Sequence, residues 1–290
     1  MPDLNEHTIT QAVLDRFAGT PDPRLREMLS SLVRHLHGFV RDAEPTFEEW
    51  QAAIAFLTRT GQTCTDTRQE FILLSDVLGV SMLVDAINHR MPAGATETTV
   101  LGPFHVADVP FSPNGADLGE GLPGERLFVE GTVSAAAGAP LPGAVLEVWQ
   151  SDDDGFYDVQ RPELDGPQLR ACLRADGQGR FHFWTIMPTT YPIPDNGPVG
   201  ALLHATKRHP WRPAHLHFMI SAAGHEQLVT HLFVAGSDYL DSDAVFGVKE
   251  SLIQIFNQHG PGRAPDGTQV DAPWRSLSYG FGLRILQAAG

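Results

Sequence analysis

Cysteine is scarce in this sequence, with only Cys64 and Cys172 among 290 residues. The two residues lie far apart and form neither a CxxC pair nor a zinc-ribbon spacing, which argues against a disulfide framework and a thiolate metal site. Basic residues are also in deficit: 20 Lys and Arg accompany 35 Asp and Glu, and the formal net charge is -15. Nucleic acid and anionic membrane surfaces are therefore poor candidates for the main partner, because like charges repel.

Long hydrophobic runs are absent as well. The apolar stretch 71–74 is interrupted at Asp76, and the N-terminus lacks a basic segment followed by an apolar one. The sequence therefore predicts neither a membrane span nor a secretion signal, and we expect a soluble cytoplasmic protein. A chain of this length suits one large domain or a main domain with an accessory one.

The hydrophobic period is helical before Pro92. Residues 22–43 carry apolar side chains at three- and four-residue steps, which is typical of an amphipathic helix, and Pro45 ends the pattern. Thr46 and Glu49 have the spacing of a capping box that opens another helix. Further helices are expected near residues 7–18 and over residues 66–87.

After Pro92 the pattern changes to short β-prone runs separated by Gly, Pro and Asp. This pattern is typical of a β-sandwich rather than of alternating βα units. We predict an α+β fold in which a helical N-terminal domain, residues 1–97, precedes a mainly antiparallel β-sandwich domain, residues 98–290. The expected strands are 127–133, 144–150, 180–185, 215–221 and 228–234, and a last helix is expected over 245–258.

The strand 215–221 carries a pattern with chemical meaning. Because side chains alternate along a strand, His215, His217 and Met219 share one face while the residues between them share the other. One face can bind a metal ion while the other is buried. A histidine pair alone is more often half-buried and polar than ligating. The other histidines, including His182, His204, His209, His225 and His231, are expected at the surface or around a site rather than as ligands.

Two upstream tyrosines, Tyr157 and Tyr191, make a metal site more specific. Either residue alone would be a packing residue. A phenol has a pKa of about 10 and binds poorly when neutral, but a strongly Lewis-acidic ion holds it as phenolate. Zinc favours Cys, His and carboxylates, whereas two phenolates suit a trivalent ion. Fe(III) with two tyrosinates, two neutral histidines and one hydroxide sums to zero charge, which a partly buried site tolerates.

With these residues the sequence resembles the intradiol ring-cleaving dioxygenases, which are non-haem ferric enzymes. The resemblance implies that Tyr157, Tyr191, His215 and His217 hold Fe(III), with Tyr191 and His217 axial. It also implies that the protein forms a homodimer through its N-terminal helices and that a phospholipid is bound there. The segments that carry it are LGPF at 101–104, PGA at 142–144, EVWQ at 147–150, DGFY at 154–157, YPIP at 191–194 and RPAHLH at 212–217.

Within the family, the segments 155–160 and 191–200 are most similar to the hydroxyquinol-cleaving branch, and His231 stands where catechol-cleaving relatives tend to carry glutamine. Most of the substrate-pocket positions that the resemblance implies are apolar or small. Asp76 is acidic and suits a hydrogen bond from an additional ring hydroxyl. The implied pocket positions are Leu73, Asp76, Val100, Leu101, Gly102, Pro103, Phe104, Ile193, Pro194, Arg212 and Val245.

The implied reaction is cleavage of 1,2,4-trihydroxybenzene by O2 between its adjacent hydroxyl-bearing carbons. The vicinal diol would chelate the ferric ion while Tyr191 leaves the metal and takes a substrate proton. Arg212 would stabilise charge that develops on the ring, although taken alone it would be a surface cation. The product would be 3-hydroxy-cis,cis-muconate, which tautomerises to maleylacetate.

Three alternatives stay open at this stage. A catechol or chlorocatechol 1,2-dioxygenase shares the iron site and differs in the pocket. A non-catalytic β-sandwich binding module would use the same His and Tyr residues structurally or hold a structural zinc. In the third alternative, the helical segment is primarily an interaction module whose apolar stripes contact a partner.

Overall fold

The computed structural model describes residues 3–65, 68–164 and 166–286. The chain divides into two compact units, residues 1–59 and residues 60–290. The division between these units lies within a helix and precedes the domain boundary that the sequence predicts after residue 97. None of the helices in the described ranges is both long enough and apolar enough to span a membrane.

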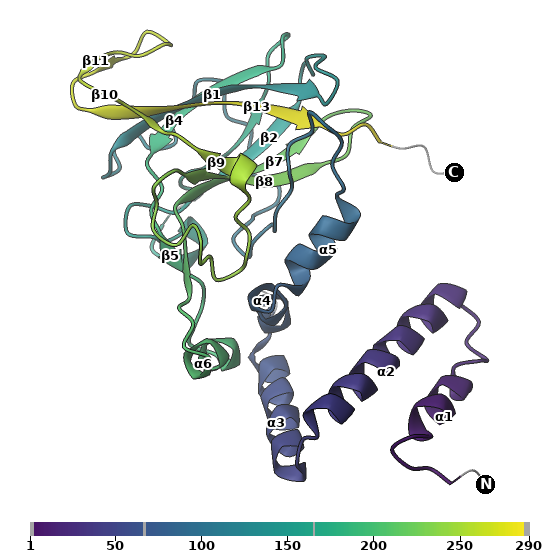
Figure 1. The fold of residues 1–290 in the computed structure, drawn as a ribbon. Helices are drawn as coiled ribbons and strands as arrows, with labels where there is room; N and C mark the ends of the chain where they lie inside the picture. The colour runs from purple at the N-terminus through teal and green to yellow at the C-terminus, as the bar shows by residue number, and fades with distance from the viewer. Residues whose placement is uncertain (1–2, 66–67, 165, 287–290) are drawn as a thin grey trace. The chain divides into compact units, whose positions relative to one another are not determined.

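The first unit is helical, as predicted (Figure 1). It contains α1 (Ile9–Arg16), α2 (Pro23–Ala43) and most of α3 (Phe47–Thr63). The side chain of Asp22 caps α2 by accepting hydrogen bonds from the first-turn backbone. The predicted capping box of α3 is confirmed, because Thr46 N donates to Glu49 Oε2 over 2.8 Å and Glu49 N donates to Thr46 Oγ1 over 3.2 Å.

The helix predicted over residues 66–87 is instead two helices, α4 (Glu70–Val77) and α5 (Val80–Asn88). The prediction of one continuous helix is wrong because Gly79 between them has a φ of 73°, a left-handed conformation that glycine adopts without steric cost. The expected start at Asp66 lies outside the described residues. A further helix, α6 (Pro198–Ala205), lies where the sequence pattern predicts none.

Two larger sheets form the predicted sandwich, in the orders β10-β13-β1-β4 and β3-β2-β7-β8-β9. Neighbouring strands are antiparallel except for the pairs β1–β13 and β8–β9, so a mainly antiparallel arrangement is confirmed. The strands are β1 (Arg126–Ala135), β2 (Val145–Trp149), β3 (Arg170–Arg174), β4 (Arg180–Ile186), β7 (His215–Ser221), β8 (Leu228–Val234), β9 (Ile253–Gln254), β10 (Asn257–His259) and β13 (Trp274–Leu283). Each of the five strands expected from the sequence is confirmed.

Short elements complete the unit. Strand β5 (Tyr191–Pro192) pairs with β6 (Trp211–Arg212), and β11 (Gly262–Arg263) pairs with β12 (Gln269–Val270). Single 3-10 turns are η1 (Asp158–Gln160) and η2 (Glu250–Leu252). The helix predicted over 245–258 is therefore wrong: that stretch holds η2, β9 and β10. Phe246 has a φ of 59°, which a right-handed helix does not accommodate, and β9 instead pairs with β8.

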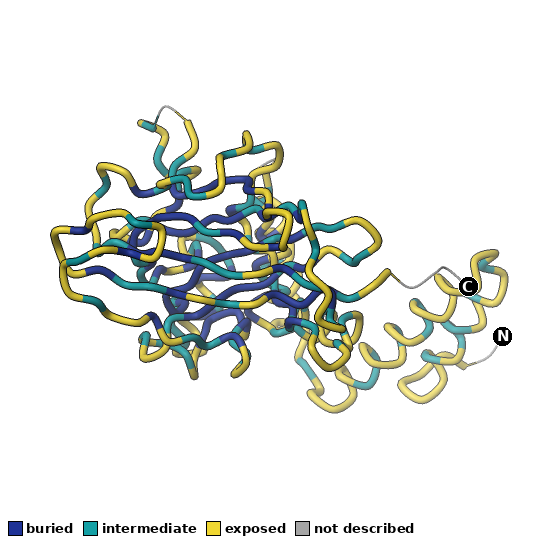
Figure 2. Tube along the Cα trace, turned by 90° about the horizontal axis from the view of Figure 1, so that it is seen from above, coloured by how far each residue is buried: buried dark blue, intermediate teal, exposed yellow. Residues whose placement is uncertain are grey.

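The main core contains apolar side chains from both sheets. Leu127 of β1 and Phe281 of β13 pack in one cluster with Leu146 of β2 and Phe218 of β7. Figure 2 shows these strands as long buried segments between exposed loops. Full burial of such a side chain contributes about 1.5–3 kcal/mol. Because Phe218 points into this core, strand alternation turns the two histidines of β7 to the opposite face of the sheet.

Candidate metal and substrate site

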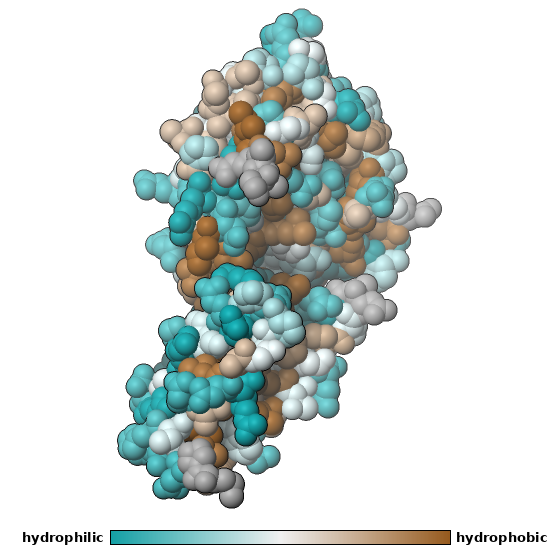
Figure 3. Space-filling view, turned by 90° about the vertical axis from the view of Figure 1, so that its right-hand side faces the viewer, coloured by the Kyte–Doolittle hydropathy of each residue, from teal (hydrophilic) through white to brown (hydrophobic). Residues whose placement is uncertain are grey.

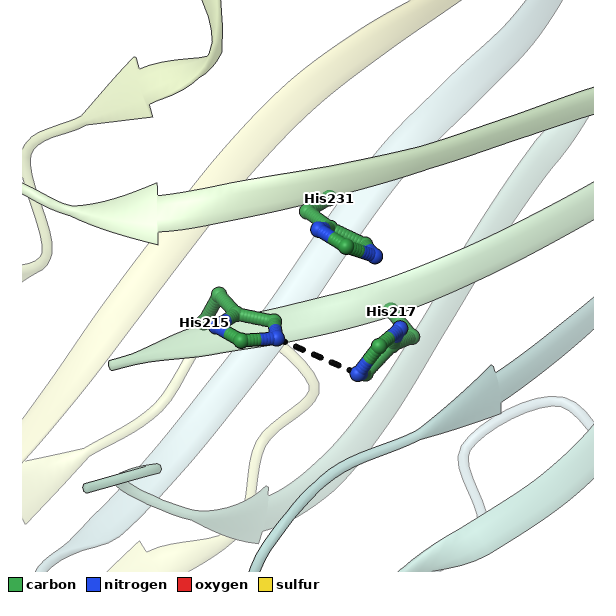
Figure 4. Close-up of side chains that lie close together, drawn as sticks. All are labelled: His215, His217 and His231. Atoms are coloured by element: carbon green, nitrogen blue, oxygen red, sulfur yellow. Dashed lines mark hydrogen bonds between the residues drawn. The ribbon is translucent and has the colours of Figure 1, made fainter. Parts of the chain in front are cut away.

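Three histidines gather on neighbouring strands (Figure 4). His215 and His217 come from β7, and His231 of β8 lies directly opposite His217 in the strand register. All three are at most 1% exposed, and their ligand nitrogens lie within 4.8 Å of one another, so they form a group that can hold a metal ion. His215 Nε2 and His217 Nε2 are 3.1 Å apart, the pair marked by the dashed line.

The two predicted tyrosine ligands meet the same two nitrogens. Tyr157 Oη lies 2.8 Å from His217 Nε2, and Tyr191 Oη lies 3.4 Å from His215 Nε2. Both tyrosines are at most 2% exposed. The structure thus brings the four expected ligands together, from positions that span 60 residues of sequence.

Local structure explains how the tyrosines arrive there. Tyr157 precedes η1, and its backbone N–H donates to Gln160 Oε1 over 2.9 Å. Tyr191 is held by β5, where it pairs with Arg212 of β6. Gly155 has a φ of 87°, and a Cβ there would come within 3.0 Å of Thr190 O and 3.3 Å of Tyr191 Cβ. Glycine at this position therefore lets the two tyrosine segments approach each other.

Aromatic packing fixes the rings that carry the donors. Phe104 stacks on Tyr157, with ring centroids 4.3 Å apart and planes 22° apart, and it meets Tyr191 edge-on at 6.1 Å. Trp149 stacks on His217 at 4.6 Å. These contacts restrict the ring orientations, so the donor atoms are held in place by packing as well as by hydrogen bonds.

The donor set fits a metal ion on geometric grounds. Metal–ligand bonds of about 2.0–2.1 Å at angles of about 90–109° correspond to ligand separations of about 2.8–3.4 Å. Three separations among the four donors, 2.8, 3.1 and 3.4 Å, all lie in that range. His215 Nδ1 lies 2.7 Å from Pro213 O. A carbonyl oxygen can only accept a hydrogen bond, so Nδ1 carries the proton of the neutral ring. That contact leaves Nε2 with a free lone pair for a metal.

Electrostatics favour neutral histidines at this site. Burial, helped by the charge of Arg212, lowers the pKa of His215 to about 3. Burial also lowers the pKa of His217 well below its usual value, with His215 as the next cause. Neutral imidazoles are the form that binds metals, so both residues are ready to ligate at neutral pH.

Tyr157 requires a strong cation to bind as phenolate. Burial raises the pKa of Tyr157 well above 10, the neighbouring Tyr191 adds to the rise, and Arg212 and Arg170 oppose it only in part. Without a metal this phenol is neutral at physiological pH. Binding as phenolate therefore needs an ion with a high positive charge, in agreement with the ferric ion that the donor types favour.

Arg212 is a buried residue of the site rather than a surface cation. It is 2% exposed, and its Nη1 donates to Tyr191 Oη over 3.1 Å. Asp243, which the sequence analysis did not single out, pairs with its Nε at 3.0 Å. Burial alone would raise the pKa of Asp243, but the charge and hydrogen bonds of Arg212 lower it overall. No local motif marks Asp243, because it lies 31 residues from Arg212 in a loop.

Five of the eleven expected pocket residues lie in or against two buried clusters. Leu73 of α4, Ile193 and Val245 belong to one buried apolar cluster, and Val100 packs against it. Phe104 belongs to a second cluster with Trp149 and the two tyrosines. Among the rest, Gly102 lies beside the site, since a Cβ there would be 3.3 Å from the ring of His217. Pro194 is half-buried, and Leu101 and Pro103 are exposed.

Asp76 of α4 is buried, as an acidic pocket residue would be. Burial raises its pKa, while a hydrogen bond with Ser81 and the charge of Arg212 act in the opposite direction. The negative charge of Asp243 also raises the pKa of Asp76. Asp76 therefore lies within electrostatic reach of the Arg212–Asp243 pair.

Comparisons with known proteins find related sequences and structures. Residues 101–285 match the family described as Dioxygenase, and residues 22–96 match the family described as Catechol dioxygenase N terminus. The chain is 56% identical over 253 residues to 6-chlorohydroxyquinol 1,2-dioxygenase of Cupriavidus pinatubonensis, covering 87% of this chain and 92% of that protein. It is 48% identical over 275 residues to hydroxyquinol 1,2-dioxygenase of Nocardioides simplex, covering 94% of each. The structure of hydroxyquinol 1,2-dioxygenase from Pseudomonas putida matches with a TM-score of 0.91 at 48% identity, covering 97% of this chain and 99% of that one.

Proposed function

Because this chain belongs to the intradiol ring-cleavage dioxygenases, we propose that it cleaves hydroxyquinol, 1,2,4-trihydroxybenzene, with O2 at a non-haem Fe(III) site. The product is 3-hydroxy-cis,cis-muconate, which tautomerises to maleylacetate. The observation that carries the proposal is the convergence of two buried phenol oxygens and two buried imidazole nitrogens at separations of 2.8–3.4 Å.

The ligands in this proposal are Tyr157, Tyr191, His215 and His217. When bound, Fe(III) withdraws electron density from a chelated diol and makes the ring reactive towards O2. The chain's own contribution centres on Tyr191, whose Oη is the oxygen that takes a proton from a substrate hydroxyl. Arg212 Nη1 lies 3.1 Å from that oxygen. Its positive charge stabilises the charge on Tyr191 Oη and the charge that develops on the substrate ring.

A set of three histidines with His231 as the third ligand is the competing arrangement. Its Nδ1 faces Arg212 Nη2 at 3.5 Å, and a metal ion beside that nitrogen would be repelled by the guanidinium. In the tyrosine set His215 Nε2 lies equally near, 3.5 Å from Arg212 Nη1, but two phenolates would offset the charge of the guanidinium there, whereas a set of three neutral histidines supplies no negative charge. We therefore place His231 beside the ligands rather than among them.

The choice of hydroxyquinol over catechol is supported by the names of the relatives, which are 48–56% identical to this chain. In this proposal the ring lies among the apolar pocket residues, and Asp76 hydrogen-bonds the third hydroxyl. The pocket comprises Leu73, Asp76, Val100, Leu101, Gly102, Pro103, Phe104, Ile193, Pro194, Arg212 and Val245.

The test is a visible spectrum of the purified protein before and after anaerobic addition of hydroxyquinol, together with metal analysis. A tyrosinate-to-Fe(III) band that shifts on addition supports the ligands and substrate chelation together. A colourless protein that contains zinc and shows no substrate-dependent oxygen uptake would instead establish a binding module. A kcat/KM ratio that favours catechol would overturn the substrate choice and the role of Asp76.

The N-terminal helices support a proposal about assembly. Helix α2 exposes Leu25, Met28, Leu32 and Phe39 at 45–63%, although they occupy its apolar stripe. Figure 3 shows apolar surface beside hydrophilic surface on the face of the molecule that it draws. We expect residues 1–97 to form a homodimer that covers this stripe, with a phospholipid bound between apolar helix faces.

Light scattering and mass spectrometry of a lipid extract test that assembly. A monomeric mass would contradict the homodimer, and an extract without phospholipid would remove the lipid from it. The cytoplasmic location expected from the sequence is checked by fractionation of the source cells.

A further inference from the structure

Arg212 and Asp243 form an ion pair in which both side chains are 2% exposed. Arg212 Nε donates to Asp243 Oδ1 over 3.0 Å, and Nη2 donates to Oδ2 over 3.3 Å. One edge of the guanidinium therefore lies against both oxygens of the carboxylate. This two-point contact defines orientation as well as distance, because a guanidinium and a carboxylate are both planar.

The carboxylate is itself held by its own loop. Asp243 Oδ2 accepts a hydrogen bond from Gly247 N over 2.9 Å, and Oδ1 accepts one from Val245 N over 3.3 Å. Each oxygen thus accepts one backbone and one guanidinium hydrogen bond. Rotation of the carboxylate would break several of these contacts at once, so its plane is fixed by the backbone of residues 243–247.

Gly247 closes the loop against the same pair. A Cβ at this position would lie 2.9 Å from Arg212 Nη2, 3.2 Å from Asp243 Oδ2 and 3.1 Å from Thr99 Oγ1. The Thr99 hydroxyl donates to Gly247 O over 3.2 Å and ties the loop to a neighbouring segment. The site therefore has no room for a larger side chain behind the guanidinium.

The opposite edge of Arg212 faces the proposed reaction centre. Its Nη1 lies 3.1 Å from Tyr191 Oη and 3.5 Å from His215 Nε2. Because the guanidinium is rigid, holding Nε and Nη2 against Asp243 determines where Nη1 points. The negative charge of Asp243 also balances Arg212, so the neutral charge sum expected for the ferric donor set is preserved.

We propose that Asp243 is a positioning residue that orients Arg212 so that Nη1 meets Tyr191 Oη. This inference rests on the proposed function and deepens it. In this role Asp243 touches neither the substrate nor the metal, and it acts on Tyr191 through Arg212.

A double-mutant cycle with Asp243→Asn and Arg212→Gln tests the proposal kinetically. We expect Asp243→Asn to lower kcat by about tenfold or more, with KM changed by less than about threefold and iron content retained. In the Arg212→Gln background the same substitution should lower kcat by less than about twofold, because the guanidinium that Asp243 orients is absent. Equal losses in both backgrounds would overturn the proposal.

Spectra supply a readout that a purely structural role would not affect. The visible band of the resting Asp243→Asn protein should shift relative to wild type, since Tyr191 loses an aligned N–H donor. Gly247→Ala keeps the carboxylate but crowds Nη2, and we expect it to shift the band in the same way. Asp241→Asn is the matched control, because Asp241 is exposed in the same loop, and it should leave both band and kcat unchanged. An unshifted band in both Asp243→Asn and Gly247→Ala would overturn the proposal.

Thermal unfolding separates this inference from the proposed function. Each single variant leaves one buried charge unpaired and should lower the Tm, whereas the double variant should recover part of the loss. Additive losses in Tm would contradict the pairing. A wild-type protein without iron or colour would contradict the metal site, and the Tm cycle would still report on the pair.

Discussion

Among single residues, the two tyrosines differ most clearly in their hydrogen-bond environment. Tyr191 Oη accepts a hydrogen bond from Arg212 Nη1, whereas Tyr157 Oη contacts His217 Nε2. Tyr157 is also stacked against Phe104. A cationic donor stabilises a phenol oxygen while its charge changes, and tight stacking opposes movement. Of the two proposed ligands, Tyr191 is therefore better suited to exchange a proton.

We predict that Tyr191→Phe lowers kcat by about 10²–10⁴-fold, because the proton acceptor is removed. The tyrosinate band of the variant should weaken and shift. Absorption spectroscopy measures the band, and oxygen uptake measures kcat. Tyr279→Phe is the control, since that ring packs against Phe281 in β13, and it should leave both unchanged. Unaltered colour and rate in Tyr191→Phe would remove Tyr191 from the metal.

Among the elements, α4 is joined to α6 by buried polar contacts. Glu70 in the first turn of α4 is fully buried, and its Oε1 accepts a hydrogen bond from Val199 N of α6 over 3.1 Å. Arg68 Nε donates to Glu70 Oε2 over 2.9 Å. This arrangement caps α6 from another helix and holds Leu73 of α4 against the pocket cluster. Helices α4 and α6 thus form one wall of the proposed pocket.

Glu70→Gln should lower the free energy of unfolding by about 1–3 kcal/mol, because a buried charge-assisted contact is lost. We also expect KM for hydroxyquinol to rise more than kcat falls, since the pocket wall loosens while the metal ligands stay in place. Urea unfolding and steady-state kinetics measure the two effects. Glu250→Gln, at an exposed position, is the control. A loss of stability with an unchanged KM would show that the cap does not support the pocket.

At the scale of the whole molecule, the proposed ligands connect separate parts of the sandwich. Tyr157 follows β2, Tyr191 lies in β5, and the two histidines lie in β7. A bound ion links these elements in the folded state only, so metal binding and folding are coupled.

Removing the metal with a chelator should lower the Tm. An ion present at 100 times its dissociation constant contributes about 2.7 kcal/mol, and each kcal/mol corresponds to about 2–4 °C for a domain of this size. Calorimetry of metal-free and Fe(III)-reloaded protein measures the difference. An identical Tm in both forms would contradict the site.

The metal-free protein should also lose stability in acid. The pKa of His215 is lowered from 6.5 to about 3 in the folded state, so between these values the unfolded chain binds more protons. The resulting stability is present above about pH 6.5 and is lost as the pH falls towards 3. Urea unfolding at a series of pH values should show this slope in the wild type and a shallower one in His231→Gln, because burial lowers the pKa of His231 as well. Equal slopes in the wild type and in His231→Gln would contradict a lowered pKa of His231 in the folded state.

Local chemistry made much of this structure predictable. The capping box at Thr46 and Glu49 and the strands expected from the sequence depend on neighbours within a few residues. The pairing of His215 and His217 on one face follows from strand alternation alone. Where a local signal was ambiguous, prediction failed: the apolar spacing over 245–258 imitates a helix, and glycines in β13 obscure a ten-residue strand. Gly282 is needed there because a Cβ would lie 1.9 Å from Gly94 O.

The sequence by itself determined the candidate donor types, the shared face of the two histidines and the change from helices to strands, because these depend on side-chain chemistry and local backbone preference. Only the tertiary structure decided that Asp243 pairs with Arg212, that His231 lies opposite His217 and that Glu70 caps α6. Those contacts join residues that are far apart in the chain and carry no shared motif. Burial then makes them necessary, since a charge or polar group removed from water must find a partner wherever the fold brings one.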